Sequence, residues 1–348
     1  MNRIKFSFTL IFSFLLAFCQ TPEPATSTPS KRIAYCSGEA TDLNIHSINI
    51  DGSADTQLTY HTAQDIRPLW SPDGESILFQ TNRFNSIVYK LYLMNKNGSD
   101  PRNITNTVTD LFTESFPAWA PDGTHIAYTS ENALGAPKIY LLKTDETEPP
   151  FRLTSQADAI YEDQVSWSPD GSRLAFMSIA DDNEEIFMVN NDGSNLTRIT
   201  NHAASDWMPL WSPDGTKLLF LSSRDGGTDL YVTNDTATAT TRLTEDGLEK
   251  GLASWSPDGT QILYQKMEAA GNSQIYSVPS GGGIPLNLSS NVYNEIEPAW
   301  SPDGKKISFT SDREVFSELY TMSVDGSNRK RLTFNALGVQ DGCSNWEK

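Results

Sequence analysis

The stretch 70–74, which reads WSPDG, decides the fold because it returns along the chain at almost constant intervals. The same five residues begin at Trp167, Trp211, Trp255 and Trp300, and the variant WAPDG begins at Trp119. Successive copies are 49, 48, 44, 44 and 45 residues apart, and a further tryptophan, Trp346, stands 46 residues after Trp300. Self-similarity at such a period indicates a repeat architecture.

Each copy of the repeat predicts four short strands. Residues 117–119 form a first strand, PDG fits a type I turn, and residues 126–130 alternate as a second strand. In the next copy, residues 185–189 predict a third strand, and 191–193 (NDG) are a hairpin turn before a fourth strand at 197–200. Four antiparallel strands in about 45 residues are typical of a β-propeller blade.

The second, third and fourth strands occur seven times, but the first set, residues 32–59, has no tryptophan before it. The seventh first strand is the isolated one that ends at Trp346. The sequence therefore predicts an all-β, seven-bladed β-propeller of four-stranded antiparallel blades. Its ring is closed by the C-terminal strand, which pairs with the three N-terminal strands.

This closure brings two cysteines together. Cys36 aligns with Thr129 of a later copy, and Cys343 precedes its tryptophan by three residues, as Phe116 does. If Phe116 lies opposite Thr129, Cys343 lies opposite Cys36. Directly opposed residues have Cα atoms about 4.5–5.5 Å apart, within reach of a disulfide. We expect a Cys36–Cys343 disulfide, with two buried thiols as the alternative.

The N-terminus predicts export. Residues 1–19 combine early cations with an apolar run too short to span a bilayer, which is the pattern of a signal peptide. The run ends like a bacterial lipobox at Cys19, although Phe18 is larger than the residue usual there. Lipidation of Cys19 and ordinary secretion are both open. Residues 20–31 are rich in Pro, Thr and Ser and predict a tether, and residues 32–348 form the propeller.

The charge balance excludes several partners. The 348 residues carry 26 Lys plus Arg against 44 Asp plus Glu, a formal charge of −18. Nucleic acid is disfavoured, because phosphate binding needs clustered cations. Anionic lipid surfaces are disfavoured for the same reason, so membrane contact is expected only through the N-terminal lipid anchor. We expect a monomer.

The repeat resembles the propeller repeats of the TolB family. WSPDG together with fourth-strand sequences such as Arg152-Leu153-Thr154 carries the resemblance, which covers residues 32–346. It implies an envelope propeller that docks a lipoprotein near its channel mouth. Similar repeats occur in oligopeptidase-like enzymes and oligogalacturonate lyases. TolB has six blades and an N-terminal α/β domain, so we expect a TolB-like lipoprotein rather than TolB.

Acidic residues recur five positions before the tryptophans. They are Asp65, Glu114, Glu162, Asp206, Glu295 and Asp341, with Lys250 as the exception. Because the inter-blade loops emerge on one face, we expect a ring of carboxylates at the channel mouth, which focuses negative potential there. Such a ring would bind Ca²⁺ or Mg²⁺, or a basic partner. The alternative is that these acids cap loop amides.

Other candidates lie on the same face. Trp207 departs from the repeat and is a possible ligand anchor, or it packs between blades. His61 and His202 each stand nine residues before a tryptophan and are candidate ligands for a transition metal. Tyr161 and Tyr293 are candidate sugar-stacking residues.

The expected function is a protein-interaction scaffold in the periplasm or on the cell surface, which binds a basic envelope protein or peptide through its acidic face. No GxSxG, HExxH or phosphate-binding loop occurs in the sequence. No cofactor is required by the sequence, apart from the possible Ca²⁺. The alternatives are a metal-dependent polysaccharide lyase or hydrolase and a carbohydrate-binding propeller.

Overall fold

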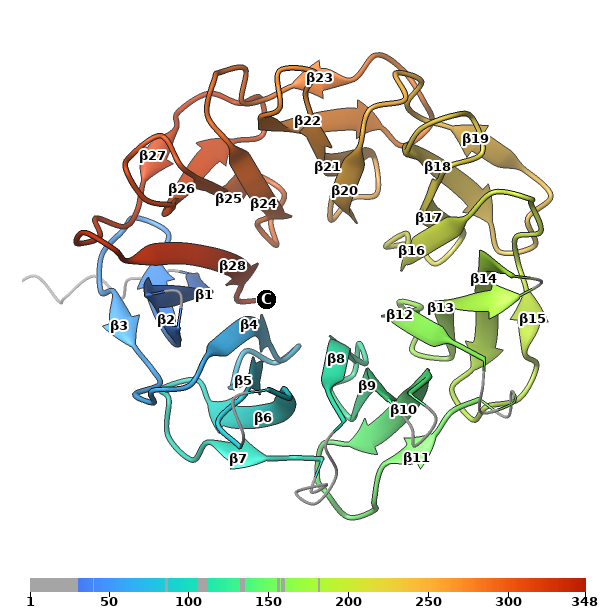
Figure 1. Cartoon of the computed structure of the whole chain (residues 1–348), viewed down its shortest axis with the longest axis horizontal. Coiled ribbons are helices and arrows are strands. Elements are labelled where there is room, and N and C mark those ends of the chain that lie inside the picture. Colours follow the sequence, from blue (N-terminus) through green and yellow to red (C-terminus); the bar gives the residue numbers. More distant parts are fainter. Residues whose placement is uncertain are drawn as a thin grey trace, which may run out of the picture. The chain divides into compact units, whose positions relative to one another are not determined.

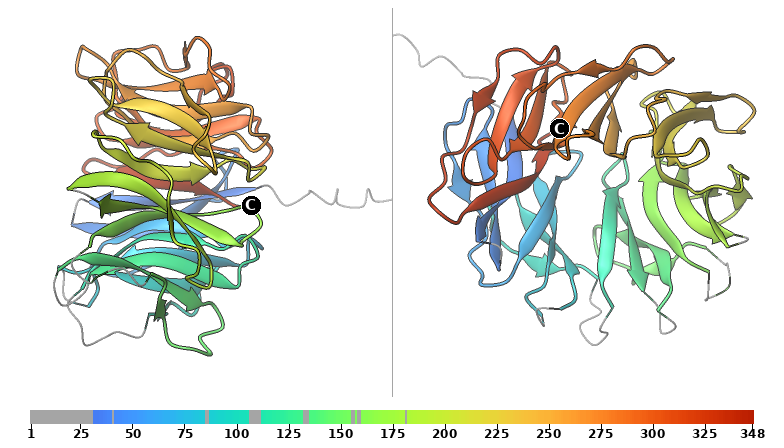
Figure 2. Two further views of the ribbon diagram at one scale, coloured as in Figure 1. Left: turned by 90° about the vertical axis from the view of Figure 1, so that its right-hand side faces the viewer. Right: turned by 45° about the horizontal axis from the view of Figure 1, so that its top comes forward.

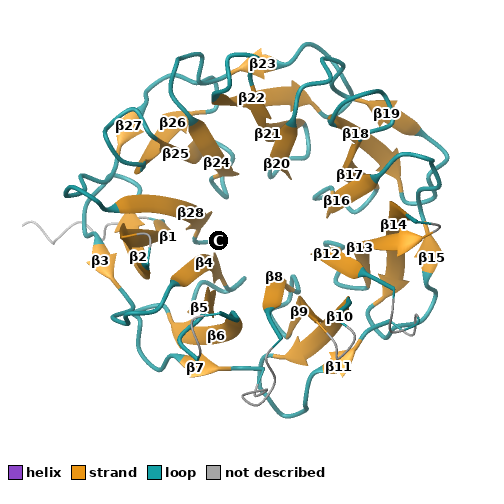
Figure 3. Ribbon diagram, in the orientation of Figure 1, coloured by secondary structure: helices purple, strands orange, loops and turns teal. Residues whose placement is uncertain are grey.

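The computed structural model describes residues 31–39, 41–84, 87–105, 112–131, 135–154, 157, 160–180 and 182–348. These residues form 28 strands in seven four-stranded antiparallel sheets, arranged around a central channel (Figure 1, Figure 3). Within them, no helix has the length and apolar character needed to cross a membrane. The predicted seven-bladed propeller is confirmed.

Three blades follow one another between Asp65 and Arg198. The first contains β4 (Asp65–Trp70), β5 (Ser76–Thr81), β6 (Lys90–Asn95) and β7 (Arg102–Asn103). The second contains β8 (Glu114–Trp119), β9 (His125–Glu131), β10 (Pro137–Lys143) and β11 (Phe151–Arg152). The third contains β12 (Glu162–Trp167), β13 (Arg173–Ala180), β14 (Asn183–Asn190) and β15 (Thr197–Arg198).

Three more blades complete the run. The fourth contains β16 (Asp206–Trp211), β17 (Lys217–Ser222), β18 (Asp229–Asn234) and β19 (Thr240–Arg242). The fifth contains β20 (Lys250–Trp255), β21 (Gln261–Met267), β22 (Ser273–Pro279) and β23 (Leu286–Asn287). The sixth contains β24 (Glu295–Trp300), β25 (Lys306–Ser311), β26 (Glu318–Ser323) and β27 (Lys330–Arg331).

The seventh, closing blade joins the two ends of the propeller. It has the order β28 (Gln340–Trp346), β1 (Arg32–Glu39), β2 (Asp42–Asn49) and β3 (Thr56–Gln57), so the C-terminal strand is innermost, as predicted (Figure 1). Outside the strand ladder, Glu347 donates its backbone N–H to the Arg32 carbonyl at 2.9 Å. The ring is therefore closed by hydrogen bonds between residues more than 300 positions apart.

Each blade presents two different edges (Figure 2). Loops between the second and third strands, and loops between blades, emerge on one face, which we call the loop face. The turns between the first and second strands, and between the third and fourth, emerge on the opposite face, the turn face. The described chain enters β1 at Lys31 on the turn face, beside the turn at Ile50, whose N–H donates to the Lys31 carbonyl.

Adjacent blades are held together by apolar side chains. The described core consists of seven clusters, and each combines residues of two neighbouring blades, such as Leu141 with Phe176. The repeated tryptophans join this core from the innermost strands. Four of them also donate the indole N–H to a carbonyl of the preceding blade, for example Trp167 to Ala118 at 3.1 Å. These four tryptophans therefore connect their blades to the preceding blades by hydrogen bonds as well as by packing.

Side chains of the SPDG turn form hydrogen bonds within the turn itself. In the third blade, Asp170 accepts hydrogen bonds from the Ser168 hydroxyl at 2.6 Å and the Ser172 N–H at 3.0 Å. These hydrogen bonds lower the pKa of Asp170 to about 2, and the bond from the Ser168 hydroxyl has the largest effect. Gly171 has φ 70°, which favours glycine. The turn aspartates are structural, as the sequence indicated.

Candidate functional site

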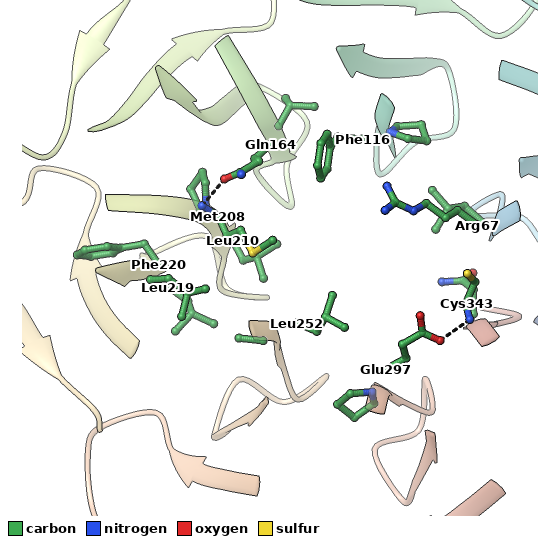
Figure 4. A pocket seen from close by; sticks show the side chains of 18 of the residues that line it. Arg67, Phe116, Gln164, Met208, Leu210, Leu219, Phe220, Leu252, Glu297 and Cys343 are labelled. Atoms are coloured by element: carbon green, nitrogen blue, oxygen red, sulfur yellow. Dashed lines mark hydrogen bonds between the residues drawn. The ribbon is translucent and has the colours of Figure 1, made fainter. Parts of the chain in front are cut away.

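A β-bulge interrupts every innermost strand at the same place. In all seven blades the residue three positions before the tryptophan has φ between 46° and 59°, the left-handed region that non-glycine residues rarely adopt. The seven residues are Arg67, Phe116, Gln164, Met208, Leu252, Glu297 and Cys343. All of them line one central cavity of about 600 Å³, and Figure 4 shows them pointing into it. We call this set the channel ring.

The bulge overturns the predicted register between the cysteines. Cys36 pairs with Gly342 rather than with Cys343, because the bulge adds one residue to β28. Both cysteines are free thiols in the structure, and their disulfide stays a prediction. The two side chains still share a hydrogen bond. That bond from Cys36, with smaller contributions from the backbone and charge of Arg67, lowers the pKa of Cys343, whereas the pKa of Cys36 is raised.

The channel ring is chemically divided. Glu297, Cys343 and Arg67 come from three consecutive blades and form a polar sector. Phe116, on the next blade, lies under the Arg67 guanidinium, whose carbon is 5.7 Å from the ring centre. Met208 faces the polar sector from the far side of the channel, and Leu252 lies beside Glu297 on the neighbouring blade (Figure 4). The cavity therefore offers one cation and one carboxylate opposite an apolar wall.

Side chains of the channel ring bind the backbone of the next blade. The Met208 N–H donates to Gln164 Oε1 at 2.7 Å, and the Cys343 N–H donates to Glu297 Oε2 at 2.5 Å (Figure 4). Both bonds cross from one innermost strand to its neighbour. They hold the bulged backbone in place, so the geometry of the channel ring is set before any ligand arrives.

On one side the cavity borders the apolar core between the fourth and fifth blades, and we call this part of its wall the lobe. Its lining includes Leu210, Leu219, Leu221, Leu230 and Ala253. The side chains of Leu219 and Leu230 have no exposed surface, and Leu221 is 2% exposed. The lobe is therefore packed core that borders the channel rather than open space.

The predicted acidic ring at the channel mouth is wrong. All six carboxylates of that set (Asp65, Glu114, Glu162, Asp206, Glu295 and Asp341) are at most 5% exposed. The bulge separates them from the channel, and five of them pair with cations, namely three partly exposed arginines and two buried lysines. Arg83–Asp65, Arg224–Asp206 and Arg313–Glu295 are 2.9, 2.6 and 2.5 Å apart, and Lys90–Glu114 and Lys138–Glu162 are both 3.3 Å. Their position fits a structural role.

Two blades depart from this pattern. In the fifth blade the signs are exchanged, because Lys250 is buried and its ammonium lies 3.0 Å from the Asp229 carboxylate. In the closing blade Asp341 has no cationic side chain within 4.0 Å among the described residues. Burial therefore raises the pKa of Asp341.

The remaining candidates are separated from one another. Trp207 packs against the core between the fourth and fifth blades, which confirms the packing alternative. The Tyr161 hydroxyl donates to Asp163, and Tyr293 is 43% exposed on an inter-blade loop. Cys19 lies outside the described residues.

The two histidines do not fit a metal centre. His61 and His202 are exposed on different inter-blade loops, and the Nδ1 atom of each accepts a backbone N–H of its own loop. The described part of the chain contains no group of three His, Cys, Asp or Glu side chains able to hold a metal ion. Two isolated ligands cannot replace the three or more that such centres use.

Comparison with known proteins agrees with the fold. The family model of the TolB beta propeller domain matches residues 87–270, just over half of the chain. The uncharacterized peptidase YuxL of Bacillus subtilis is 36% identical over 76 residues, which are 22% of this chain and 11% of that protein. The chain thus matches only about a tenth of the length of this curated relative.

Two solved structures share the architecture. TolB of Acinetobacter baumannii is 19% identical, with a TM-score of 0.57 over 90% of this chain and 82% of that one. An oligogalacturonate lyase in complex with manganese is 14% identical, with a TM-score of 0.66 over 89% of this chain and 88% of that one. At these identities the likeness shows the fold alone. With its family match, its seven blades and its six WSPDG-type motifs, the chain belongs to the TolB beta propeller domain family.

Proposed function

We propose that this protein is an exported TolB-like scaffold that binds a partner protein through its loop face. One observation carries the proposal: large apolar side chains lie exposed on the loops over three consecutive blades, the sixth, the closing and the first. They are Val292, Tyr293, Val315, Phe334, Leu337, Tyr60, Phe84 and Ile87. We call this set the apolar arc.

The exposure of these residues is high. Leu337 is 86% exposed, Val315 84%, Val292 82%, Ile87 81% and Tyr60 79%. A single exposed apolar residue needs no explanation, but several on one face of a rigid scaffold are typical of an interaction surface.

The chemistry of the partner follows from charge. The chain has a formal charge of −18, so a basic protein surface is steered toward it and an acidic one is repelled. We therefore propose an apolar contact patch flanked by Lys or Arg. The six predicted carboxylates do not supply this attraction directly, because they are buried.

The proposal also includes export of the protein and its anchoring through the N-terminus. A lipid on Cys19 followed by the tether of residues 20–31 would reach the propeller at Lys31, on the turn face. The loop face would then remain free for a partner in the periplasm or outside the cell. A lyase or a carbohydrate binder is less well supported, because its candidate residues are not brought together.

Site-specific photo-crosslinking tests the proposal. A photoreactive amino acid replaces Leu337 on the loop face, and in a second variant it replaces Ile284, which is 92% exposed on the turn face. After irradiation of the producing cells, we expect a discrete crosslinked species from position 337 and none from 284. Equal crosslinking from both positions, or none from 337, contradicts the proposal.

A further inference from the structure

We propose that the channel binds an apolar α-amino acid as a zwitterion, with its carboxylate on Arg67 and its ammonium group on Glu297. This site is separate from the apolar arc and does not depend on it. The side chains around it face open space, because Arg67 is exposed, Leu252 is 47% exposed, and Arg67 and Glu297 both point into the channel (Figure 4). The cavity of about 600 Å³ falls in the range of small-ligand pockets, about 300–1,000 Å³.

Arg67 offers a site for the carboxylate of the ligand. Among the described residues, no carboxylate oxygen lies within 4.0 Å of its guanidinium group. The Phe116 ring, 5.7 Å from the guanidinium carbon, supports one side of this group. A planar guanidinium presents paired N–H donors that match the two oxygens of a carboxylate.

Glu297 offers a site for the ammonium group. The hydrogen bonds that its carboxylate accepts within the described chain both end on Oε2, from the Cys343 N–H at 2.5 Å and from the Thr310 hydroxyl at 3.5 Å. They fix the carboxylate while its other oxygen, Oε1, faces the channel (Figure 4). The part of the chain that the structure describes places no Lys or Arg nitrogen within 4.0 Å of Glu297. Its charge is therefore available to a cationic group of a ligand.

The arrangement of the two charges selects a small zwitterion. Arg67 and Glu297 lie on the first and sixth blades, and the closing blade between them contributes only Cys343 to the channel ring. A purely anionic ligand would be repelled by Glu297, and a purely cationic one by Arg67. The Cys343 thiol is a weak hydrogen-bonding group, so a peptide amide held between the two charges would lack a strong partner. An α-amino acid carries both charges on one carbon, with no amide between them.

Apolar members of the channel ring select the side chain of the ligand. Phe116 and Leu252 flank the polar sector on its two sides, and Met208 faces it across the channel (Figure 4). All three are exposed or half-buried, so a ligand can reach them, in contrast to the packed leucines of the lobe. An apolar side chain gains affinity by removing this surface and its own from water. The channel ring therefore favours an amino acid such as leucine over glycine.

Saturation-transfer difference NMR of the full-length protein tests the proposal with four probes. They are L-leucine, glycine, L-leucinamide, which lacks the carboxylate, and 4-methylpentanoate, which lacks the ammonium group. We expect leucine to bind about ten-fold more tightly than each of the other three, because each of them lacks one of the three contacts.

Two variants separate the roles of the charges. Arg67→Gln should weaken leucine at least ten-fold without weakening leucinamide, which has no carboxylate to lose. Glu297→Gln should weaken leucine at least ten-fold without weakening 4-methylpentanoate, and its amide oxygen can still accept the Cys343 N–H. Arg102→Gln and Glu75→Gln, which remove exposed charges outside the channel, are the matched controls and should have no effect.

Several results would overturn the proposal. These are no saturation transfer to leucine at millimolar concentration, equal affinity for leucine and either of its single-charge analogues, or leucine binding that Arg67→Gln and Glu297→Gln do not change. Tighter binding of the dipeptide Leu-Leu than of leucine would show that the site takes peptides instead. Thermal unfolding of each variant establishes that it is folded. Because the apolar arc is intact in these variants, failure here leaves the proposed function untouched.

Discussion

Glu39→Arg should restore an ion pair that the closing blade lacks. In the first, fourth and sixth blades an arginine follows the second strand by two residues and binds the buried carboxylate of the first strand. The pairs are Arg83–Asp65, Arg224–Asp206 and Arg313–Glu295, and in each the arginine also donates to the hydroxyl at the end of the second strand. In the closing blade Ser37 lies opposite Asp341, and Glu39 occupies the arginine position.

The substitution exchanges a like charge for an opposite one. Hydrogen bonds to charged groups contribute about 1.5–3 kcal/mol, and we take about 2 kcal/mol because the equivalent arginines are partly exposed. For a propeller of this size that corresponds to a rise of about 3 °C in Tm. Differential scanning calorimetry at pH 7 measures the rise. Glu39→Gln is the matched control, since it removes the repulsion without adding a cation.

A double-mutant cycle decides whether the gain comes from the pair. In an Asp341→Asn background Glu39→Arg has no carboxylate to bind, so its effect should fall to the level of Glu39→Gln. A rise of equal size in both backgrounds would refute the reasoning. So would a Glu39→Arg protein no more stable than wild type.

Three further predictions follow from the buried polar groups. Oxidation of the protein by glutathione disulfide should join Cys36 to Cys343 across the ring closure and raise Tm by about 3–7 °C, an effect absent in Cys343→Ser. Lys138→Met should lower the free energy of unfolding by about 3–5 kcal/mol, because it leaves Glu162 buried without its cation. The double variant Lys138→Met/Glu162→Leu should regain most of the lost free energy of unfolding. Burial raises the pKa of Asp341, so the folded protein is more stable when this carboxyl is protonated, and that stability is lost as the pH rises. Differential scanning calorimetry should therefore show that the Tm advantage of Asp341→Asn over wild type grows from pH 4 to pH 8.

The fold could be predicted because the repeat records it directly. The tryptophans and PDG turns mark the same two points in six of the blades, and Trp346, which no PDG follows, indicates how the ring closes. The side-chain directions of the innermost strands could not be predicted, because they depend on the bulge. Strict alternation places residues three and five positions before the tryptophan on one face. The left-handed residue at the bulge breaks this pattern, so Phe116 enters the channel and Glu114 is buried.

One signal for the buried carboxylates was present in the sequence. Three of the acids, Asp65, Asp206 and Glu295, are each followed by their arginine after 18 residues. A constant spacing between opposite charges indicates a pair inside the blade rather than an open acidic surface. The channel ring had a weaker signal, since its positions hold seven different residue types while the tryptophan three residues later does not vary. The lobe depends on the packing of two blades and left no sequence signal.

The most direct test of the central claim, that the loop face binds the partner, is an affinity measurement on the partner that crosslinks to position 337. Surface plasmon resonance compares wild type with Phe334→Asp/Leu337→Asp on the apolar arc and with Ile284→Asp on the turn face. We predict that the loop-face variant loses at least ten-fold in affinity, mostly through a faster dissociation rate, while Ile284→Asp binds like wild type. Unchanged binding of the loop-face variant, or equal loss in both, would contradict the account.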